Sequence, residues 1–322
     1  MSRDQVHVVV GASGGTGAAL VRELLRREYR VRGVNRSGRA DVPAGVEIVR
    51  GDAADPERMR QVCQDAGVVY NAVNPPLDRW REDFPAVVDG VLAGAEAAGA
   101  RMVFVDDTWM YGRVSGPMTE DLPERPVCNK GVLRAWLAER VLAAHARGQV
   151  ATVIGRAPEL YGPGVESLLG RTLFGAAVRG RSGLWAGSTT EPLTPMFIED
   201  FAYGLVELGE NTEALGQVWH LPTPPPTTAG EFIDGISIES GRRFRVHRVS
   251  PGLVRAAGIF STVAREGAEM LYQFEHPHVI DSTKYRNVFG HGKVTSYEAG
   301  IRATLDWYRT RQPARGLIPS GR

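Results

Sequence analysis

Short apolar runs alternate with longer segments of helical periodicity over the first half of the chain. Residues 6–10, Val-His-Val-Val-Val, are an almost continuous apolar run, which predicts a buried strand. Segment 17–29 follows with Leu20, Leu24 and Leu25 at helical spacing, which predicts an amphipathic helix. Further strands are predicted over 29–36, 45–52, 67–73, 100–107 and 150–157, and further helices over 55–66, 84–99 and 129–148.

Strands that alternate with helices at this spacing predict an α/β fold, in which a doubly wound parallel sheet carries helices on both faces. After residue 156 the regularity weakens. Helices are predicted within 160–180, 193–210 and 227–241, and the proline-rich segment 222–226 is predicted to be a loop. We therefore expect a large domain over 1–155, to which part of 190–222 returns, a smaller domain over 156–311 and a loose tail over 312–322.

Composition narrows the classes of protein. The chain of 322 residues is 43% hydrophobic and 23% charged, which is typical of a soluble globular enzyme. A formal net charge of +1 argues against a nucleic-acid partner. No apolar run reaches the roughly 18 residues of a membrane span, so no membrane partner is expected. Cys63 and Cys128 provide neither a disulfide framework nor a CxxC metal pair. Because a strand is predicted from residue 6, no room remains for a signal peptide, and we expect a cytoplasmic protein without a bound metal.

Three glycines separate the first predicted strand from the first predicted helix. In the pattern Gly11-x-x-Gly14-x-x-Gly17, the first glycine permits a tight turn and the second lets backbone amides approach a pyrophosphate. The third lets the helix pack closely against the strand, and the helix N-terminus favours phosphate charge. The 1–155 domain is therefore predicted to be a dinucleotide-binding Rossmann domain, and 156–311 to bind mainly a small-molecule substrate. Contacts to the dinucleotide are predicted from Gly11, Ser13, Gly14, Gly15, Thr16, Gly17, Asn35, Arg36, Ser37, Asp52, Ala53, Ala72 and Asn74.

The end of the second strand predicts which dinucleotide is preferred. A carboxylate there would bind a ribose 2′-hydroxyl, but this chain has Asn35-Arg36-Ser37. An arginine suits a phosphate monoester, so NADP is favoured over NAD. The alternative is that Arg36 is a solvated surface residue. Asp52 is expected to accept a hydrogen bond from the adenine amine, whereas Asp55 is better explained as the cap of the next helix.

With these motifs the chain resembles the NAD(P)-dependent epimerase/dehydratase family, the extended short-chain dehydrogenases. The resemblance runs over nearly the whole length and implies a Rossmann domain, a C-terminal substrate domain and a cleft between them. It rests on "GASGGTG", "GDAAD", "WMYG" at 109–112, "GRAPELYGPG" at 155–164, "FIEDFAYGL" at 197–205, "GQVWHL" at 216–221 and "DSTKYRNVFG" at 281–290.

The resemblance also implies a catalytic pair that this chain lacks. Family members usually carry a Ser or Thr after the fifth strand and Tyr-x-x-x-Lys on the next long helix. None of the nine tyrosines here has a lysine four residues later. Aligning Glu139 with the family's glutamate puts Gly131 at the tyrosine position and Ala135 at the lysine position. If Lys130 is taken as the lysine instead, Pro126 stands at the tyrosine position.

Replacement chemistry is predicted from the end of the fifth strand. Asp107 is the first candidate for the acid or base, with a loop cap as its alternative role. Thr108 and Tyr111 follow, although Tyr111 also matches a structural Tyr-Gly turn of the family. Lys130 is predicted to orient the cofactor or substrate, or else to be solvated.

Three functions remain open on the sequence. The first is an NADP-dependent oxidoreductase or epimerase acting on a small organic substrate with atypical acid/base residues. The second is a non-redox enzyme on the same fold, such as a cyclase, dehydratase or isomerase. The third is a binding protein that senses the dinucleotide.

The family resemblance implies a homodimer through helices 84–98 and 129–147, pairing as a four-helix bundle. The expected apolar stripes are Val88 and Leu92 on the first helix and Leu133, Leu137 and Val141 on the second. The alternative is that both stripes only cover the sheet.

Overall fold

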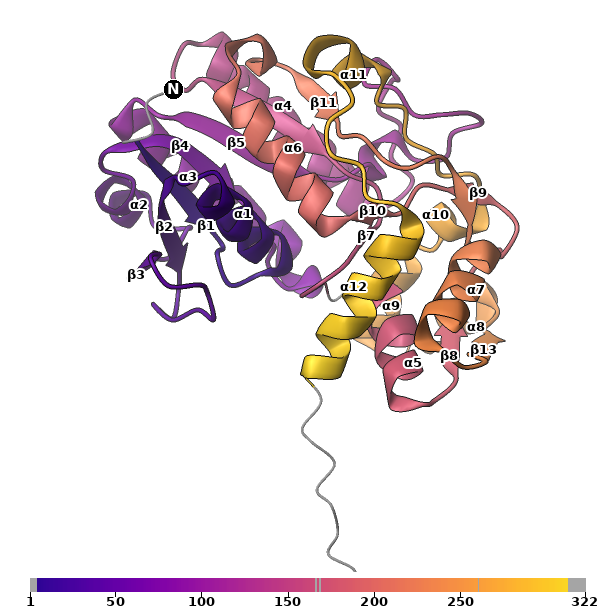
Figure 1. Cartoon of the computed structure of the whole chain (residues 1–322). Coiled ribbons are helices and arrows are strands. Elements are labelled where there is room, and N and C mark those ends of the chain that lie inside the picture. Colours follow the sequence, from indigo (N-terminus) through magenta and orange to yellow (C-terminus); the bar gives the residue numbers. More distant parts are fainter. Residues whose placement is uncertain (1–4, 166, 168, 260, 312–322) are drawn as a thin grey trace, which may run out of the picture.

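A seven-stranded parallel sheet forms the centre of the molecule (Figure 1). The computed structural model describes residues 5–311 except 166, 168 and 260, so the predicted tail over 312–322 lies outside the described residues. The strand order is β3-β2-β1-β4-β5-β6-β11, with every neighbouring pair parallel. The strands are β1 (Val6–Val10), β2 (Arg30–Asn35), β3 (Glu47–Arg50), β4 (Ala66–Asn71), β5 (Arg101–Asp106), β6 (Thr152–Arg156) and β11 (Val218–His220).

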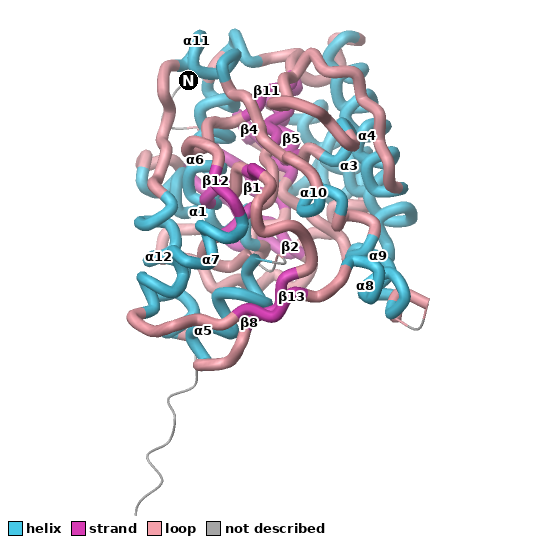
Figure 2. The backbone as a smooth tube through the Cα atoms, turned by 90° about the vertical axis from the view of Figure 1, so that its right-hand side faces the viewer, coloured by secondary structure: helices cyan, strands magenta, loops and turns pink. Residues whose placement is uncertain are grey.

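Helices cover both faces of this sheet, which confirms the predicted doubly wound α/β fold. Figure 2 shows α1 and α6 on one side of the strands and α3 and α4 on the other. Alternate residues of β1 point to opposite faces of the sheet. Val9 packs beneath α1 and α6, whereas Val8 and Val10 pack beneath α2, α3 and α4. The helices are α1 (Gly15–Arg26), α2 (Pro56–Val62), α3 (Trp80–Ala98), α4 (Asn129–Ala146) and α6 (Ile198–Glu210).

The predicted apolar stripes on the helices at 84–98 and 129–147 pack into the core between the helices and the sheet. Val88, Leu137 and Val141 are completely buried against the sheet, and Leu92 and Leu133 pack partly buried against them. Val88, Leu137 and Val141 therefore cover the sheet, as in the alternative interpretation of the stripes, and are not available to an intersubunit bundle.

The second half of the chain forms a smaller layer with a core of its own. Its helix α7 lies against α12, and three two-stranded pairings, β7 with β10, β8 with β13 and β9 with β12, connect its loops. The strands are β7 (Leu160–Tyr161), β8 (Gly183–Trp185), β9 (Pro192–Leu193), β10 (Met196–Phe197), β12 (Thr227–Thr228) and β13 (Val246–Arg248). The helices are α5 (Gly175–Arg179), α7 (Ala229–Ser240), α8 (Pro251–Ala257), α9 (Thr262–Ala268), α10 (Tyr272–Glu275), α11 (Thr283–Phe289) and α12 (Tyr297–Thr310).

Sequence periodicity predicted the helices and strands of the second half of the chain less accurately than those of the first half. The segment 222–226 is a loop, as predicted, and α7 occupies most of its predicted range. Among its described residues, the segment 160–180 contains the short strand β7, a π-helical turn at Gly170–Phe174 and the five-residue α5 instead of one long helix. Strand β11 returns to the sheet beside β6, and α6 packs on the sheet next to α1.

The fold brings the loops that follow β1, β4, β5 and β6 to one edge of the sheet, because the strands are parallel. Two of these loops contain short 3-10 helices, η1 (Leu77–Arg79) and η2 (Trp109–Tyr111). From the other half of the chain, α9 lies against η1. In the part of the chain that the structure describes, no helix has the length and apolar character needed to span a membrane. Both cysteines, Cys63 and Cys128, are buried and free.

Candidate active site

The loop between β1 and α1 and the first turn of α1 are packed so closely that Gly11, Gly15 and Gly17 have no room for a side chain. Gly11 has a φ of +90°, and a Cβ atom there would lie 2.7 Å from the carbonyl oxygen of Ala72. A Cβ atom at Gly17 would lie 2.1 Å from the carbonyl oxygen of Gly11. Both distances are shorter than any ordinary contact, so the backbones of strand, loop and helix touch directly. The predicted roles of Gly11 in the turn and Gly17 in helix packing agree with this geometry.

The outer side of the same loop is open. Ser13 and Gly14 are exposed and Thr16 is partly exposed. A Cβ atom at Gly14 would meet only the carbonyl oxygen of Gly11, at 3.5 Å, so the protein's own packing does not require glycine there. Helix α1 begins at Gly15 without a side-chain cap from the described residues and without an acidic residue in its first turn. Open backbone with uncapped helical amides suits a pyrophosphate, and the residues present therefore fit a dinucleotide.

The turn after β2 is organised by Asn35. Its side-chain oxygen accepts hydrogen bonds from the amide of Gly38 at 2.7 Å and from the hydroxyl of Ser37 at 3.1 Å. Its side-chain nitrogen donates to the carbonyl oxygen of Arg39 at 2.8 Å. Arg36, between these residues, is exposed and forms no hydrogen bond or ion pair with the described residues. Asn35 and Ser37 thus shape the turn, and Arg36 is the side chain left to meet a ligand.

The remaining predicted dinucleotide contacts follow β3 and β4. Asp52 is exposed and accepts a hydrogen bond from the amide of Ala54 at 3.0 Å. Ala53 is buried, and Asn74 is exposed. Asp55 accepts hydrogen bonds from two amides in the first turn of α2, at 3.0 and 3.1 Å, which confirms its predicted role as the cap.

Asp107 has two partners at the carboxyl end of β5. Its Oδ1 accepts a hydrogen bond from the amide of Trp109 at 2.9 Å, so the carboxylate does cap its own loop. Its Oδ2 lies 3.0 Å from Nε of Arg134. Burial raises the pKa of Asp107 to about 6, even though the guanidinium of Arg134 acts in the opposite direction. The side chain remains 17% exposed.

Asp106 belongs to a network behind Asp107 that is buried except at Glu124. It accepts a hydrogen bond from Nε of Arg156 at 2.9 Å, and the same guanidinium donates to the hydroxyl of Tyr111 at 2.7 Å and to Glu124 at 2.8 Å. The Tyr111 hydroxyl also lies 2.8 Å from Nε2 of His220. Burial raises the pKa of Tyr111 to about 12 and lowers that of His220 to about 3. With 1% exposure, Tyr111 has the structural role that was the alternative interpretation.

Thr108 and Lys130 are also paired with buried or half-buried groups. The hydroxyl of Thr108 lies 2.9 Å from Nε2 of His278, and both residues are buried. The ammonium group of Lys130 forms an ion pair with Glu266 of α9 and lies 3.8 Å from a carboxylate oxygen of Glu269. Its side chain is only 5% exposed, so the alternative that Lys130 is solvated is wrong. Its positive charge therefore lies beside two carboxylates from the C-terminal half of the chain.

Position 131 has no room for a side chain. A Cβ atom on Gly131 would lie 2.5 Å from the carbonyl oxygen of Trp109 and 2.9 Å from Cβ of Pro126. The backbone amide of Gly131 donates to Sγ of Cys128, which caps α4. Ala135 packs partly buried against the apolar residues that surround η2. At position 131, where the family's tyrosine would stand if Glu139 is aligned with the family's glutamate, the backbone therefore leaves no room for a side chain.

Several residues at this edge were not predicted, because they come from the distant segment around α10. The hydroxyl of Tyr272 donates to the carbonyl oxygen of Trp109 at 3.2 Å, and Nε1 of Trp109 donates to Oε1 of Gln273 at 3.2 Å. His278 also contacts Thr108, through Nε2 and the threonine hydroxyl. Sequence spacing carries no signal for such contacts, since they join residues more than 160 positions apart.

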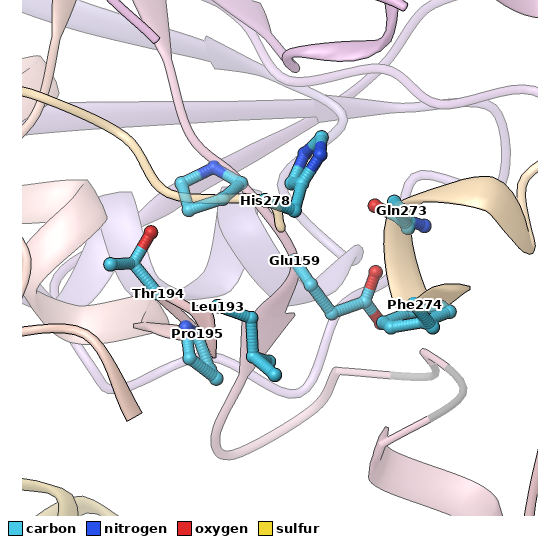
Figure 3. A pocket seen from close by; sticks show the side chains of 8 residues that line it. Glu159, Leu193, Thr194, Pro195, Gln273, Phe274 and His278 are labelled. Carbon is cyan, nitrogen blue, oxygen red and sulfur yellow. The ribbon is translucent and has the colours of Figure 1, made fainter. Parts of the chain in front are cut away.

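A small cavity lies between the end of β6 and α10 (Figure 3). Its volume is about 10 Å³, which is room for about one water molecule. Figure 3 shows Glu159 extending toward Gln273 and Phe274. The lining combines polar and apolar side chains: Pro158, Glu159, Leu193, Thr194, Pro195, Gln273, Phe274 and His278. Within the described residues, no group of three or more His, Cys, Asp or Glu side chains comes together as a metal site.

Comparison with known proteins agrees with this geometry. Residues 7–219 match the model of the NAD dependent epimerase/dehydratase family. The chain belongs to this family. The membership confirms the resemblance that the motifs indicated, and it covers the sheet from β1 to β11 with its glycine loop.

Individual relatives of this epimerase/dehydratase protein are distant. A 2-alkyl-3-oxoalkanoate reductase of Shewanella oneidensis is 22% identical, over 91% of this chain and 84% of its own length. The structure of a UDP-glucuronic acid 4-epimerase from Bacillus cereus, with UDP-glucuronic acid and NAD, has a TM-score of 0.77 at 18% identity and covers 95% of this chain and 99% of its own. An epimerase from Methanothermobacter thermautotrophicus has a TM-score of 0.80 at 19% identity, with 95% and 93% covered. At these identities the structures show the shared fold.

Proposed function

We propose that this epimerase/dehydratase family member is an NADP-dependent oxidoreductase or epimerase that acts on a small organic substrate, with Asp107 as its acid/base residue. The observation that carries the proposal is the carboxyl group of Asp107 at the end of β5, whose pKa is raised by burial and whose side chain is the least buried of the four candidates. Its side chain is 17% exposed, against 5% for Lys130 and 1% or less for Thr108 and Tyr111. A carboxyl group with a pKa of about 6, at the carboxyl end of a parallel strand, can exchange a proton near neutral pH.

The dinucleotide would be held by the open side of the glycine loop and by the turn after β2. Backbone amides in the first turn of α1, at Gly15 and Thr16, would meet the pyrophosphate, and Arg36 would meet the 2′-phosphate of NADP. When bound, the nicotinamide supplies hydride transfer, which the protein's own side chains cannot provide. The structural relative from Bacillus cereus contains NAD, so the preference for NADP rests on Arg36 alone.

Asp107 would move the substrate proton. At pH 7 a carboxyl group with a pKa of about 6 is mostly ionised, so it can accept the proton of a substrate hydroxyl during oxidation. In the reverse direction it returns the same proton to the oxygen of the reduced carbonyl. The amide of Trp109 and the guanidinium of Arg134 fix the carboxylate from two sides, which keeps its orientation without removing its basicity.

The substrate class rests on one relative, because the cavity beside α10 has room for only about one water molecule. The Shewanella oneidensis relative is named as a reductase of 2-alkyl-3-oxoalkanoates. We therefore propose a 3-oxo compound, or the corresponding secondary alcohol, as the class to test first.

The test is turnover of NADPH with 2-alkyl-3-oxoalkanoates, followed by the loss of absorbance at 340 nm. Stoichiometric oxidation of NADPH is expected for a reductase. An epimerase would instead convert its substrate with catalytic amounts of dinucleotide and no net change in absorbance. Conversion of substrate in protein freed of dinucleotide would contradict the proposal and favour a non-redox enzyme.

A dinucleotide-binding protein without turnover is the second candidate. It is favoured by the buried pairing of Thr108, Tyr111 and Lys130, which leaves one accessible acid/base group among the four predicted residues. Tight binding of dinucleotide, with no turnover of any small carbonyl or hydroxyl compound that copurifies with the protein, would favour this candidate.

A further inference from the structure

We propose that one end of the smaller layer, formed by the turn between α5 and β8, by β13 and by α8, binds peripherally to a membrane surface rich in anionic phospholipid. None of its residues belongs to the predicted dinucleotide or acid/base set, so this surface is independent of the proposed function. The basic end, as we call it, consists of exposed arginines and exposed apolar side chains: Arg179, Arg181, Leu184, Arg243, Arg245, Arg248, Leu253 and Ile259.

The two segments that build the basic end carry positive charge without negative charge. Residues 240–265 contain six arginines and residues 167–190 contain three, and neither segment contains an aspartate or a glutamate. The whole chain is almost neutral, with 38 lysines and arginines against 37 aspartates and glutamates. The positive excess is therefore local, and the small net charge of the chain conceals it.

The fold brings the two segments together. Strands β8 and β13 are parallel partners, with Leu184 opposite His247. Leu184 points to the outer side of this pair, because both of its neighbours in β8 are buried, and His247 shares that side. Arg242 donates a hydrogen bond to the carbonyl oxygen of Val178 at 2.8 Å, which connects the start of one segment to the turn after α5. Helix α8 follows β13 almost immediately along the chain, and Figure 1 shows all three elements together in the smaller layer.

The arginines of the basic end have no acidic partners of their own. Five exposed side chains form no hydrogen bond or ion pair with the described residues: those of Arg179, Arg181, Arg243, Arg245 and Arg248. The nearby Arg255 differs, because it pairs with Glu275 at 2.6 Å. Unpaired like charges repel one another, and an anionic surface relieves that repulsion. Because a guanidinium matches the geometry of phosphate oxygens, this charge favours a surface that carries phosphate groups.

Apolar side chains project among these arginines. Leu184 is 50% exposed, Leu253 is 64% exposed and Ile259 is 76% exposed. Helix α8, which carries Leu253, has no buried residue. A nucleic acid would pair with the arginines alone and would leave these apolar side chains in water. The surface of a membrane accepts both, because its phosphate groups lie directly above its acyl chains.

The binding is peripheral. The expectation of no membrane partner rested on the length of the apolar runs, which limits only helices that span a membrane. A surface that combines arginines with a few projecting apolar side chains binds reversibly, through charge and shallow insertion. Because salt screens exposed charges, the binding should weaken as the salt concentration rises.

The test is co-sedimentation of the full chain with lipid vesicles. We expect the protein to bind vesicles of phosphatidylglycerol and phosphatidylcholine in equal parts, and to stay in solution with vesicles of phosphatidylcholine alone. Arg243→Gln combined with Arg245→Gln should weaken binding by about 25-fold, at roughly fivefold for each arginine near an anionic surface. Leu253→Ser should weaken binding by at least about fivefold, because it removes an apolar side chain that inserts.

A matched control removes the same charge elsewhere. Arg30→Gln combined with Arg147→Gln lowers the net charge equally, and both arginines are exposed, at the start of β2 and directly after α4. This variant should bind the anionic vesicles as tightly as the wild type does, because the arrangement of the arginines and not the net charge decides the binding.

Several results would overturn the proposal. They are failure to bind the anionic vesicles, equal binding to both kinds of vesicle, and an equal loss of binding in the control variant. Binding to soluble polyglutamate or to duplex DNA, without binding to the vesicles, would assign the basic end to an acidic protein or to a nucleic acid and would equally overturn the membrane as its partner.

Discussion

Asp107 combines a structural contact with a carboxyl group of raised pKa, and a single substitution can separate the two. Asp107→Asn keeps an oxygen that can accept the hydrogen bond from Trp109, but it removes the group that titrates near pH 6. We expect kcat to fall by roughly 10²–10⁴-fold while dinucleotide affinity stays unchanged. In the wild type, oxidation of a hydroxyl substrate should slow as pH falls below about 6, because the base becomes protonated. Asp78→Asn, at an exposed site on η1, is the control; full activity of Asp107→Asn would refute the assignment.

Arg36 offers a second prediction at the scale of one residue. It is exposed at the end of β2, beside a turn that Asn35 holds in place without it. Arg36→Ala should therefore weaken NADP binding by about 1–3 kcal/mol, as for a charge-assisted contact, and should leave NAD binding nearly unchanged. Arg30→Ala removes the same charge from the opposite end of β2 and should affect neither dinucleotide. Calorimetric titration of both dinucleotides measures this, and equal losses for NAD and NADP would contradict the role of Arg36.

At the scale of elements, the first turn of α4 decides which chemistry the site can use. Its buried face carries Lys130, Gly131 and Arg134, and each meets a different part of the molecule. Lys130 is paired with the C-terminal half of the chain, Gly131 touches the Trp109 backbone, and Arg134 holds Asp107. Helix α4 therefore connects the C-terminal half of the chain, the Trp109 backbone and Asp107.

The close contact at Gly131 predicts an unusual response to a small substitution. Glycine to alanine within a helix is ordinarily stabilising by up to about 1 kcal/mol. At Gly131 the new Cβ would meet backbone at 2.5 Å, so we expect a net destabilisation of about 1–3 kcal/mol from overpacking. Chemical denaturation measures the free energy of unfolding. Gly116→Ala, where a Cβ meets no atom of the described residues within 4 Å, is the control and should have little effect. Equal stability of the two variants would show that α4 can move away from η2.

At the scale of the whole molecule, three buried histidines link folding to pH. Burial lowers the pKa of His7 and His278 to about 4 and that of His220 to about 3, from 6.5. Below pH 6.5 these histidines bind protons in the unfolded chain but stay neutral in the folded chain. Each histidine therefore lowers the free energy of unfolding by about 1.4 kcal/mol per pH unit as pH falls. His7→Phe removes one such group, and its stability should fall less steeply between pH 6.5 and pH 4. The same change at the exposed His291 should leave the slope unaltered; if His7→Phe retains the wild-type slope, His7 does not contribute.

Self-association is the second prediction at this scale. The family resemblance implied a dimer through α3 and α4, and we propose that it uses the outer surface of α4 instead of the stripes buried against the sheet. Val132 is 55% exposed and Trp136 is 44% exposed, one helical turn apart. Trp136→Glu should therefore convert a dimer into a monomer of about 35 kDa in light scattering at micromolar concentration. Ile238→Glu, an equally apolar exposed site on α7, should not. A monomeric wild type would refute the dimer.

The sequence by itself determined the Rossmann half of the molecule and its dinucleotide loop. The strands and helices up to β6 lie within a few residues of their predicted ranges, because each depends on local hydrophobic spacing. The cap at Asp55 and the glycine pattern are equally local, and the absence of the Tyr-x-x-x-Lys pair is a matter of residue identity alone.

Only the tertiary structure decided which of the candidate side chains is accessible and why the pair is absent. Val88 and Leu137 have the spacing of an interface but face the sheet, since periodicity gives the direction of an apolar face and not what it meets. The Trp109 carbonyl closes position 131, and Tyr272 reaches the same atom through a contact between distant parts of the chain. Contacts of this kind depend on how the two halves of the chain pack together, and no local pattern of residues encodes that.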